Sequence, residues 1–468
     1  MVFSSPLFVY YYLPLALAVY CLTPRRAKHF ALTAFSYLFY GWANPWFTLL
    51  MLGSTLVDYR CGLAMSSGGE STRKRALVVS ICANLSLLGF FKYFNFAAEN
   101  AAAFMRLIGL GSPAWEGVLQ VTLPLGISFY TFQSMSYTID VYRGNARPIR
   151  RFIDFACYVS MFPQLVAGPI VRFSDVSEQL RSRTHTLEKF ARGAALFSVG
   201  MAKKVALANP CGKVADTVFE AGSLHFLDAW HGLLAYAFQI YFDFSGYSDM
   251  AIGLGLTLGF AFPKNFDSPY RSESITEFWR RWHISLSSWL RDYLYIPLGG
   301  NRKGPGRTYV NLALVMILGG LWHGASWNFV VWGSLHGGML ALERWRGKRA
   351  VYSGLPRWAR VGLTFLLVCL GWAFFRAPDL GSAWTFLCSL AGLGSPRPEA
   401  ALLSGVVYQP YYLICMVVSG LTIWLSPTAL DWTERLTPLK AGAALAGLWL
   451  SLALLSAQTY NPFIYFIF

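Results

Sequence analysis

The chain has 468 residues, of which 55% are hydrophobic, 17% aromatic and only 13% charged. Soluble globular proteins carry about 25% charged residues, so this composition excludes a water-soluble domain of this length, and it also excludes a disordered or collagen-like chain. The 39 Lys and Arg against 23 Asp and Glu give a net charge of +16. In so apolar a chain this excess is typical of cytoplasmic loops in a membrane protein, and no nucleic-acid partner is expected.

The first apolar stretch, Phe8 to Leu22, is predicted to be a retained membrane span. No Lys or Arg precedes it, whereas Arg25, Arg26 and Lys28 follow it. A cleaved secretory signal has the reverse order, and basic residues favour the cytoplasmic side of a membrane. We therefore expect the N-terminus to lie outside the cytoplasm.

Apolar segments of membrane-spanning character recur along the whole chain. A helix that crosses a bilayer needs about 20 mainly apolar residues. The candidates are 6–22, 30–41, 44–59, 76–96, 122–142, 152–171, 190–209, 227–242, 247–262, 309–321, 326–343, 359–376, 409–426 and 440–458. Several are short and are expected to form hairpins or partial spans. The sequence predicts an all-α polytopic membrane protein with about eleven crossings plus short re-entrant or interfacial helices, in a single domain, 1–468.

The segment from Lys264 to Arg307 is too polar to cross the bilayer as a lipid-facing helix. Within it, 275–293 has the spacing of one amphipathic helix, either in the headgroup layer or walling a polar cavity. Its aromatic face comprises Trp279, Trp282, Leu286, Trp289, Leu290 and Tyr293, with His283 at its border. In an interfacial helix, Trp and Arg would serve as anchors. Alternatively, the basic residues would bind the phosphates of an anionic ligand; they are Arg271, Arg280, Arg281, Arg291, Arg302 and Lys303.

His323 is an ionisable residue in the middle of an apolar stretch, with Gly319, Gly320 and Gly324 around it. The glycines indicate a broken or tightly packed helix. Desolvation at membrane depth favours the neutral imidazole, which can accept a proton from a hydroxyl group as a general base. The alternative is a packed histidine that bonds a backbone carbonyl. His336, which also lies among glycines, is expected to have a structural role.

Asp243 and Asp249 lie in a third polar cluster, 241–249, between apolar segments. Carboxylates near the membrane need basic partners or water. An arginine of the 271–291 stretch is the partner we favour, and a proton relay or acceptor site is the alternative. The following glycines, 253, 255 and 259, lack a preceding strand and indicate helix packing rather than a dinucleotide site.

Other catalytic signatures are absent from the sequence: it has no GxSxG, HExxH or Walker motif and no CxxC pair. No metal site and no bound cofactor are therefore expected.

Three motifs together resemble the membrane-bound O-acyltransferase family. They are Trp279-Arg-Arg-Trp-His283, Trp322-His323-Gly324 and Tyr241-Phe-Asp-Phe-Ser-Gly-Tyr-Ser-Asp249. Further similar stretches run from 1–5 to 462–466, and within the family the chain is most similar to the bacterial membrane subunits of alginate O-acetylation and of cellulose acetylation. It departs from them at Gln164, where relatives often have His, and at Ile467, where many have Gln.

The resemblance implies a central funnel lined by two catalytic histidines, which match His323 and His283. It also implies a cytoplasmic acyl donor, acetyl-CoA, with Arg280, Arg281, Arg291, Trp279 and Trp282 near the donor and Asp243, Asp249 and Asn328 along the funnel or in a relay. The acetyl group would cross the bacterial inner membrane to a periplasmic SGNH-hydrolase-like partner within an exopolysaccharide synthesis and secretion complex. Two alternatives stay open: acyl transfer to peptidoglycan, a lipid or a D-alanyl carrier, and a transporter for the polymer or an acyl carrier.

Overall fold

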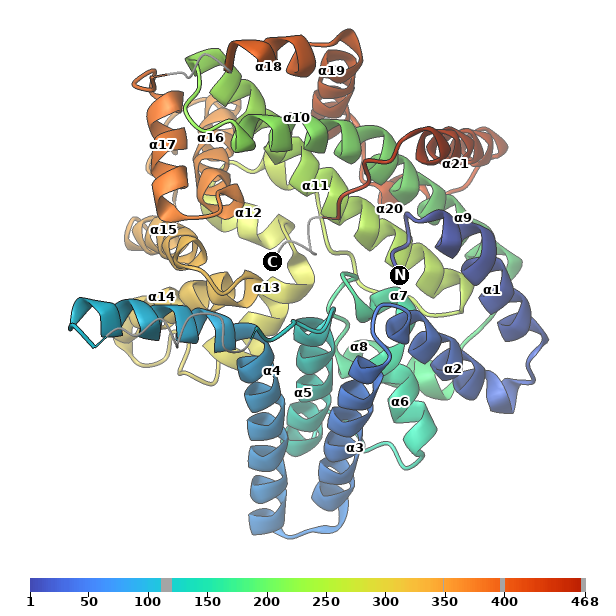
Figure 1. The fold of residues 1–468 in the computed structure, drawn as a ribbon. Coiled ribbons are helices and arrows are strands. Elements are labelled where there is room, and N and C mark those ends of the chain that lie inside the picture. Colours follow the sequence, from blue (N-terminus) through green and yellow to red (C-terminus); the bar gives the residue numbers. More distant parts are fainter. Residues whose placement is uncertain (111–119, 348, 396–399, 464–468) are drawn as a thin grey trace. The chain divides into compact units, whose positions relative to one another are not determined.

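The computed structural model describes residues 1–110, 120–347, 349–395 and 400–463, and every regular element in these ranges is a helix (Figure 1). Ile467 and most of the aromatic end at 462–466 lie outside them. The chain divides into two compact units. Unit 1 comprises Met1, Pro14–Arg183 and Gly324–Ser326, and unit 2 comprises Val2–Leu13, Thr184–His323 and Trp327–Phe468. The single domain over 1–468 stays a prediction.

Unit 1 is built from the helices α1 to α8, of which α3 and α4 form a hairpin that packs against α5 (Figure 1). Their bounds are α1 (Leu13–Leu22), α2 (Lys28–Gly41), α3 (Trp46–Ser67), α4 (Glu70–Leu107), α5 (Ile127–Arg143), α6 (Phe152–Ser160), α7 (Phe162–Leu165) and α8 (Phe173–Arg181). The prediction of one continuous span at 152–171 is wrong. Met161 leaves the helical region at φ −48 and ψ 109, and Pro163 lies in the first turn of the short α7.

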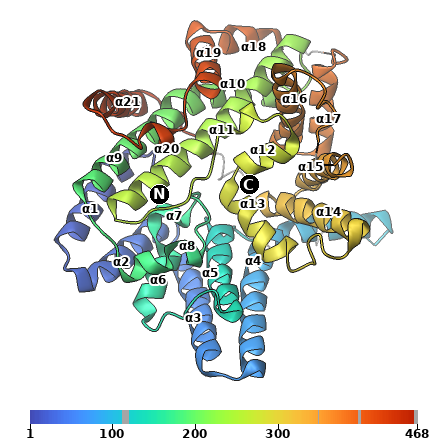
Figure 2. The same ribbon diagram turned by 180° about the vertical axis from the view of Figure 1, so that it is seen from behind.

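Unit 2 contains the remaining helices and a π-helix, η1, at Phe8–Tyr12. They are α9 (Leu187–Ala202), η4 (Lys203–Ala208), α10 (Asn209–Glu220), α11 (Phe226–Thr257), η5 (Pro269–Arg271), α12 (Ile275–Arg281), α13 (Ile284–Leu290), η6 (Arg291–Tyr295), α14 (Gly304–His323), α15 (Trp327–Trp345), α16 (Arg357–Arg376), α17 (Leu380–Leu390), α18 (Ala400–Val407), α19 (Pro410–Leu425), α20 (Ala429–Trp432) and α21 (Pro438–Ala457). The view from behind shows α14 beside α15, with which it packs (Figure 2).

The longest helix of unit 2, α11, joins two segments that the sequence analysis separates. The candidate span 227–242 and most of the candidate span 247–262 lie in one helix of 32 residues, which ends at Thr257 and is about 48 Å long at 1.5 Å per residue. Gly246 lies inside it, against α9: a Cβ atom on Gly200 would come within 2.5 Å of the Gly246 carbonyl oxygen. Gly193 and Gly253 meet in the same way. Small residues let helix backbones approach closely, so the packing interpretation of Gly253 is confirmed.

Three of the described helices are long and apolar enough to cross a membrane: α4, α16 and α21. Only 17% of the apolar window of α4 and 11% of that of α21 are buried within the protein. Exposed apolar side chains on α4 and α21 are typical of helices that contact lipid. The number of eleven crossings stays a prediction.

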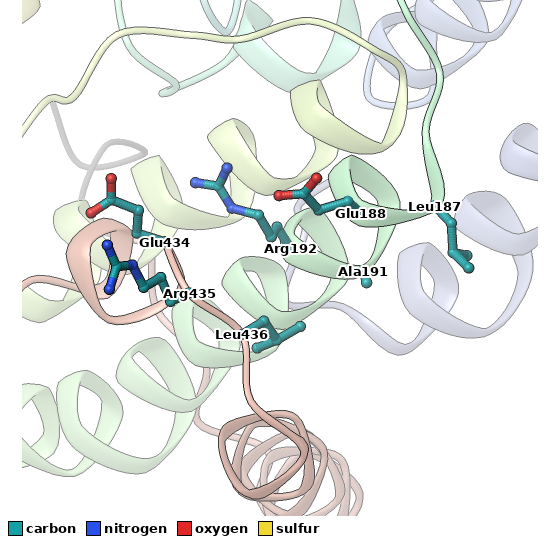
Figure 3. A pocket seen from close by; sticks show the side chains of 7 residues that line it. All are labelled: Leu187, Glu188, Ala191, Arg192, Glu434, Arg435 and Leu436. Carbon is teal, nitrogen blue, oxygen red and sulfur yellow. The ribbon is translucent and has the colours of Figure 1, made fainter.

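Two depressions mark the surface of unit 2. The larger, about 410 Å³, lies where α9 begins beside the loop that precedes α21 (Figure 3). The smaller, about 290 Å³, lies at the turn that follows η6.

Candidate functional site

His323 is the last residue of α14, at the point where that helix ends and the chain turns into α15. The two helices approach closely because Gly320 has no side chain: a Cβ atom there would lie 2.2 Å from the carbonyl oxygen of Phe329. A larger residue would push α15 away from the imidazole. The sequence predicts a broken or tightly packed helix at His323, and the structure shows both features: α14 ends there, and α15 packs closely at Gly320.

Aromatic rings surround the His323 imidazole, which is 8% exposed. Its centroid lies 5.1 Å from the ring of Trp322, 5.4 Å from Trp332 and 5.2 Å from Phe375, each in an edge-to-face arrangement. Such contacts fix the plane of a ring through its quadrupole. The sequence predicts an apolar surrounding for His323, and the structure shows that most of it is aromatic.

The polar segment that carries the second histidine is not one helix, so the prediction of a continuous amphipathic helix over 275–293 is wrong. The helix α12 ends at Arg281, and His283 adopts the left-handed conformation at φ 43 and ψ 56 before α13 begins. Backbone hydrogen bonds hold this break: Ile284 N–H donates to the Asn265 carbonyl and Asp267 N–H donates to the Arg281 carbonyl, each at 2.9 Å. Residues 265–267 therefore close the turn that presents His283.

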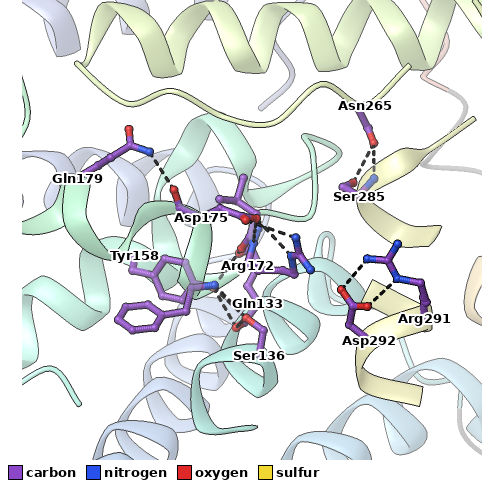
Figure 4. Close-up of polar contacts among 12 residues, drawn as sticks. Gln133, Ser136, Tyr158, Arg172, Asp175, Gln179, Asn265, Ser285, Arg291 and Asp292 are labelled. Carbon is purple, nitrogen blue, oxygen red and sulfur yellow. Dashed lines mark hydrogen bonds and ion pairs between the residues drawn. The ribbon is translucent and has the colours of Figure 1, made fainter. Parts of the chain in front are cut away.

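The side chain of Asn265 orients the fully buried His283, and Figure 4 shows the bonds of Asn265 to the neighbouring Ser285. The Asn265 Oδ1 atom accepts from the Ser285 backbone N–H at 3.2 Å and from the Ser285 hydroxyl at 2.8 Å, which identifies it as the oxygen. His283 Nδ1 lies 3.2 Å from the same oxygen. Because an amide oxygen only accepts, Nδ1 carries the proton. Nε2 of His283 is then an acceptor, and it has no hydrogen-bond partner among the described residues.

Burial lowers the pKa of His283 well below its usual value, and the nearby His323 lowers it further. The neighbouring rings explain this desolvation, since Phe244 lies 4.6 Å and Trp322 lies 6.1 Å from the His283 ring. A neutral imidazole with one fixed N–H and one accepting nitrogen is suited to take a proton from a hydroxyl group.

A series of alternating indole and imidazole rings continues beyond His323. Trp332 contacts His323 at 5.4 Å and His336 at 5.0 Å, and Trp279 donates its Nε1–H to His336 Nδ1 at 3.3 Å. Trp282 is 3% exposed and packs in the same aromatic core. The two Trp residues predicted near the donor, Trp279 and Trp282, therefore pack against other aromatic side chains rather than forming the exposed face of an interfacial helix.

Asp243 and Asp249 of α11 pair with lysines of η4, so the prediction of arginine partners is wrong. Lys204 Nζ lies 2.7 Å from Asp243, with both side chains 1% exposed, and Lys203 Nζ lies 2.6 Å from Asp249. The close packing of α9 on α11 brings these lysines to the carboxylates. Asn328 donates to the carbonyl of Ala377 at 2.7 Å, at the end of α16. These contacts favour structural roles over a relay.

The arginines that are predicted to bind the donor differ in their exposure and in their ion-pair partners. Arg281 pairs with Glu277 at 2.7 Å. Arg291 is exposed and holds Asp292 through two bonds, of 2.7 and 3.0 Å (Figure 4). Arg280 is exposed. The depression after η6 is lined by Arg291, Tyr295, Ile296, Gly299, Gly300, Asn301 and Arg302, so two of the basic residues share one hollow.

The sequence does not predict that Asn265, Ser285 and Trp332 are parts of this site. Trp332 has a signal in the sequence, because it belongs to the same Trp- and Gly-rich stretch as His323. Asn265 has none, since its contact with His283 depends on the turn at 265–267.

Comparison with known proteins places the chain among acyltransferases. Residues 145–365 match the family model described as MBOAT, membrane-bound O-acyltransferase family. The chain is 44% identical to the "Probable alginate O-acetylase AlgI" of Pseudomonas putida over 100% of both sequences. It is 35% identical to the "Peptidoglycan O-acetyltransferase" of Helicobacter pylori, over 100% of the chain and 98% of that protein. It is 30% identical to the "Teichoic acid D-alanyltransferase" of Streptococcus thermophilus, over 51% and 61% respectively.

The helical fold and these similarities define an integral membrane enzyme that transfers acyl groups to oxygen. The chain belongs to the membrane-bound O-acyltransferase family, as its motifs predict. Full-length relatives that are acyltransferases argue against the transporter alternative.

Proposed function

We propose that the protein carries an acetyl group from cytoplasmic acetyl-CoA across the bacterial inner membrane for the O-acetylation of a secreted exopolysaccharide, alginate or cellulose. A periplasmic SGNH-hydrolase-like partner would complete the transfer to the polymer, and the N-terminus would lie on the periplasmic side. The 44% identity to an alginate O-acetylase over the full length supports this choice of acceptor class.

One observation carries the proposal: Trp322 contacts both His283 and His323, and Asn265 holds the first of these with Nε2 as an acceptor. Burying a polar imidazole ring costs free energy that burying an aliphatic side chain does not. Two buried imidazoles that contact the same indole are therefore not explained by packing alone. An acyl transfer between oxygen and sulfur, in contrast, needs a proton acceptor and a proton donor.

In the proposed reaction, an acceptor hydroxyl oxygen attacks the thioester carbonyl carbon of the donor. The new C–O bond forms, the C–S bond breaks, and the hydroxyl proton passes to the imidazole of His323 and from there to the leaving thiolate. His283 would support this step from the side of the donor, where its Nε2 is available to accept a hydrogen bond from the donor molecule. Burial of the His283 ring favours its neutral form before the acceptor arrives.

The phosphates of the donor would bind the basic surface around Arg280 and the depression that Arg291 and Arg302 line. Guanidinium groups bind phosphate through two parallel hydrogen bonds. The existing Arg291–Asp292 pair, with the Arg291 side chain 61% exposed, can exchange its carboxylate partner for a phosphate at little cost. Arg281 is held by Glu277 on its own helix and would act on the donor only through its charge.

The proposal is tested with the full-length chain in vesicles that enclose radiolabelled acetyl-CoA and carry the partner outside. We expect His323→Ala to lower label transfer by about a hundredfold or more, as for removal of a general base. His225→Ala is the matched control, because His225 is exposed at the start of α11. Full transfer by His323→Ala with normal insertion and abundance would contradict the assignment.

A second acceptor class is peptidoglycan, favoured by the relative of Helicobacter pylori that is 35% identical over the full length. The same vesicles separate the two classes when labelled product is measured with alginate, cellulose or muropeptide fragments added outside. We expect label in the exopolysaccharide fragments; label only in muropeptides would replace the proposed acceptor and leave the role of His323 intact.

A further inference from the structure

The larger depression on unit 2 has a composition unlike that of the proposed acyl-transfer site. It measures about 410 Å³ and is lined by two carboxylates, two guanidinium groups and three apolar side chains: Leu187, Glu188, Ala191, Arg192, Glu434, Arg435 and Leu436 (Figure 3). None of these residues belongs to the family motifs on which the proposed function rests.

The four charged side chains that line this depression are not paired with one another in salt bridges. Within the part of the chain that the structure describes, no salt bridge joins Glu188 or Glu434 to Arg192 or Arg435. Arg192 is held in place through its Nε–H, which donates to the carbonyl of Thr433 at 3.3 Å. In the close-up view its guanidinium lies between the two carboxylates (Figure 3). Charges of both signs are thus available to a ligand that carries both.

Apolar surface adjoins the charged groups on the side of α21. The helix α21 packs against α9, is long and apolar enough to cross a membrane, and has only 11% of its apolar window buried. On α21, Leu439 is 84% exposed and Trp449 is 72% exposed, and Leu187 at the start of α9 is also 84% exposed. Exposed apolar side chains beside a charged hollow are typical of the boundary between the bilayer core and the headgroup layer.

We propose that this depression binds the headgroup of a zwitterionic phospholipid that carries a primary ammonium group, of the phosphoethanolamine kind. The phosphate would accept from Arg192 and Arg435, the ammonium would donate to Glu188 and Glu434, and the acyl chains would lie along α21. This assignment is independent of the acyl donor and acceptor.

Charge complementarity decides between lipid classes. An anionic headgroup without an amine leaves the two carboxylates beside its phosphate, where like charges repel each other. A choline headgroup carries a quaternary ammonium, which has no N–H to donate to a carboxylate. Only a headgroup with one phosphate and one primary ammonium pairs with both kinds of side chain.

Native mass spectrometry of the purified full-length protein tests the proposal, with phosphatidylethanolamine, phosphatidylglycerol and phosphatidylcholine of the same acyl chains supplied in equal amounts. We expect about tenfold preferential retention of phosphatidylethanolamine, as charge-assisted hydrogen bonds of ordinary strength would give. Glu188→Gln together with Glu434→Gln should erase the preference over phosphatidylglycerol. Arg435→Gln should weaken retention of both phospholipids by about tenfold.

Glu178→Gln and Arg181→Gln are matched controls, since they make the same charge changes on the exposed surface of α8 and should leave retention unchanged. Equal retention of the three lipids, or full retention by the pocket variants, would overturn the proposal. Displacement of the lipid by soluble phosphoethanolamine at equal concentration would refute the contact of acyl chains with α21. A dimer that the pocket variants lose would instead assign the depression to a second copy of the chain.

Discussion

The rings of His283 and Trp322 lie 6.1 Å apart, and Trp322 is in turn 5.1 Å from His323. One indole thus forms part of the surroundings of both histidines, although the three side chains come from two separate segments of unit 2. The position of each imidazole then depends on the same ring, and we expect changes at Trp322 to affect both.

The first prediction concerns Trp322 itself, which is 4% exposed. Trp322→Ala should lower acetyl transfer by about a hundredfold, because displacement of a catalytic group by about 1 Å has effects of that size. Trp322→Phe keeps an aromatic ring at the position and should retain activity to within about tenfold. The measurement is initial rate against donor concentration in vesicles; a rate of Trp322→Ala equal to that of the original protein would show that the shared ring is unimportant.

The second prediction concerns the hydrogen bond from His283 to Asn265. Asn265→Ala removes the acceptor that fixes the proton on Nδ1, so we expect kcat to fall by tenfold or more while KM for the donor stays near its original value. In a double-mutant cycle, Asn265→Ala should add little to the loss caused by His283→Ala, since the amide acts through that histidine. Additive losses would indicate a separate, structural role for Asn265.

The sequence identifies the two histidines because each is an ionisable residue in a recognisable motif. It does not predict the break between α12 and α13, since the amphipathic spacing runs through 275–293 without interruption and the break depends on backbone bonds from 265–267. For a similar reason, the sequence does not predict that Asp243 and Asp249 pair with lysines. Basic residues are plentiful near 271–291, and only the glycine-mediated contact of α9 with α11 selects those of η4.

The third prediction concerns pH. In the unfolded chain His283 titrates near its ordinary pKa of about 6.5, whereas burial lowers the pKa in the folded protein well below that value. As the pH falls below about 6.5, the unfolded state takes up a proton that the folded state does not, so the free energy of unfolding falls. Above about 6.5 this contribution to stability is fully present.

Thermal unfolding of the detergent-solubilised chain between pH 5.5 and 8 measures this effect. His283→Gln lacks the titrating group, and its midpoint should therefore decline less steeply below pH 6.5 than that of the original protein. The other histidines are present in both proteins, so the difference between the two curves reports the loss of His283 together with its interaction with His323. Parallel curves would mean that His283 is not buried in its neutral form.

The last prediction concerns the ion pair of Lys204 and Asp243, whose side chains are each 1% exposed and whose charged atoms lie 2.7 Å apart. Lys204 also donates to the carbonyl of Pro462, so it links η4 to the C-terminal segment. Lys204→Met should lower the free energy of unfolding by about 3–5 kcal/mol, because it leaves a buried carboxylate without a counter-charge. Adding Asp243→Asn should restore part of this loss, since the double variant lacks both charges of this pair. Thermal unfolding of the single and double variants measures both effects. Arg181→Ala is the control: its pair with Glu178 spans 3.7 Å on the surface and should contribute almost nothing. A double variant less stable than Lys204→Met would show instead that Asp243 stabilises the fold through contacts other than this lysine.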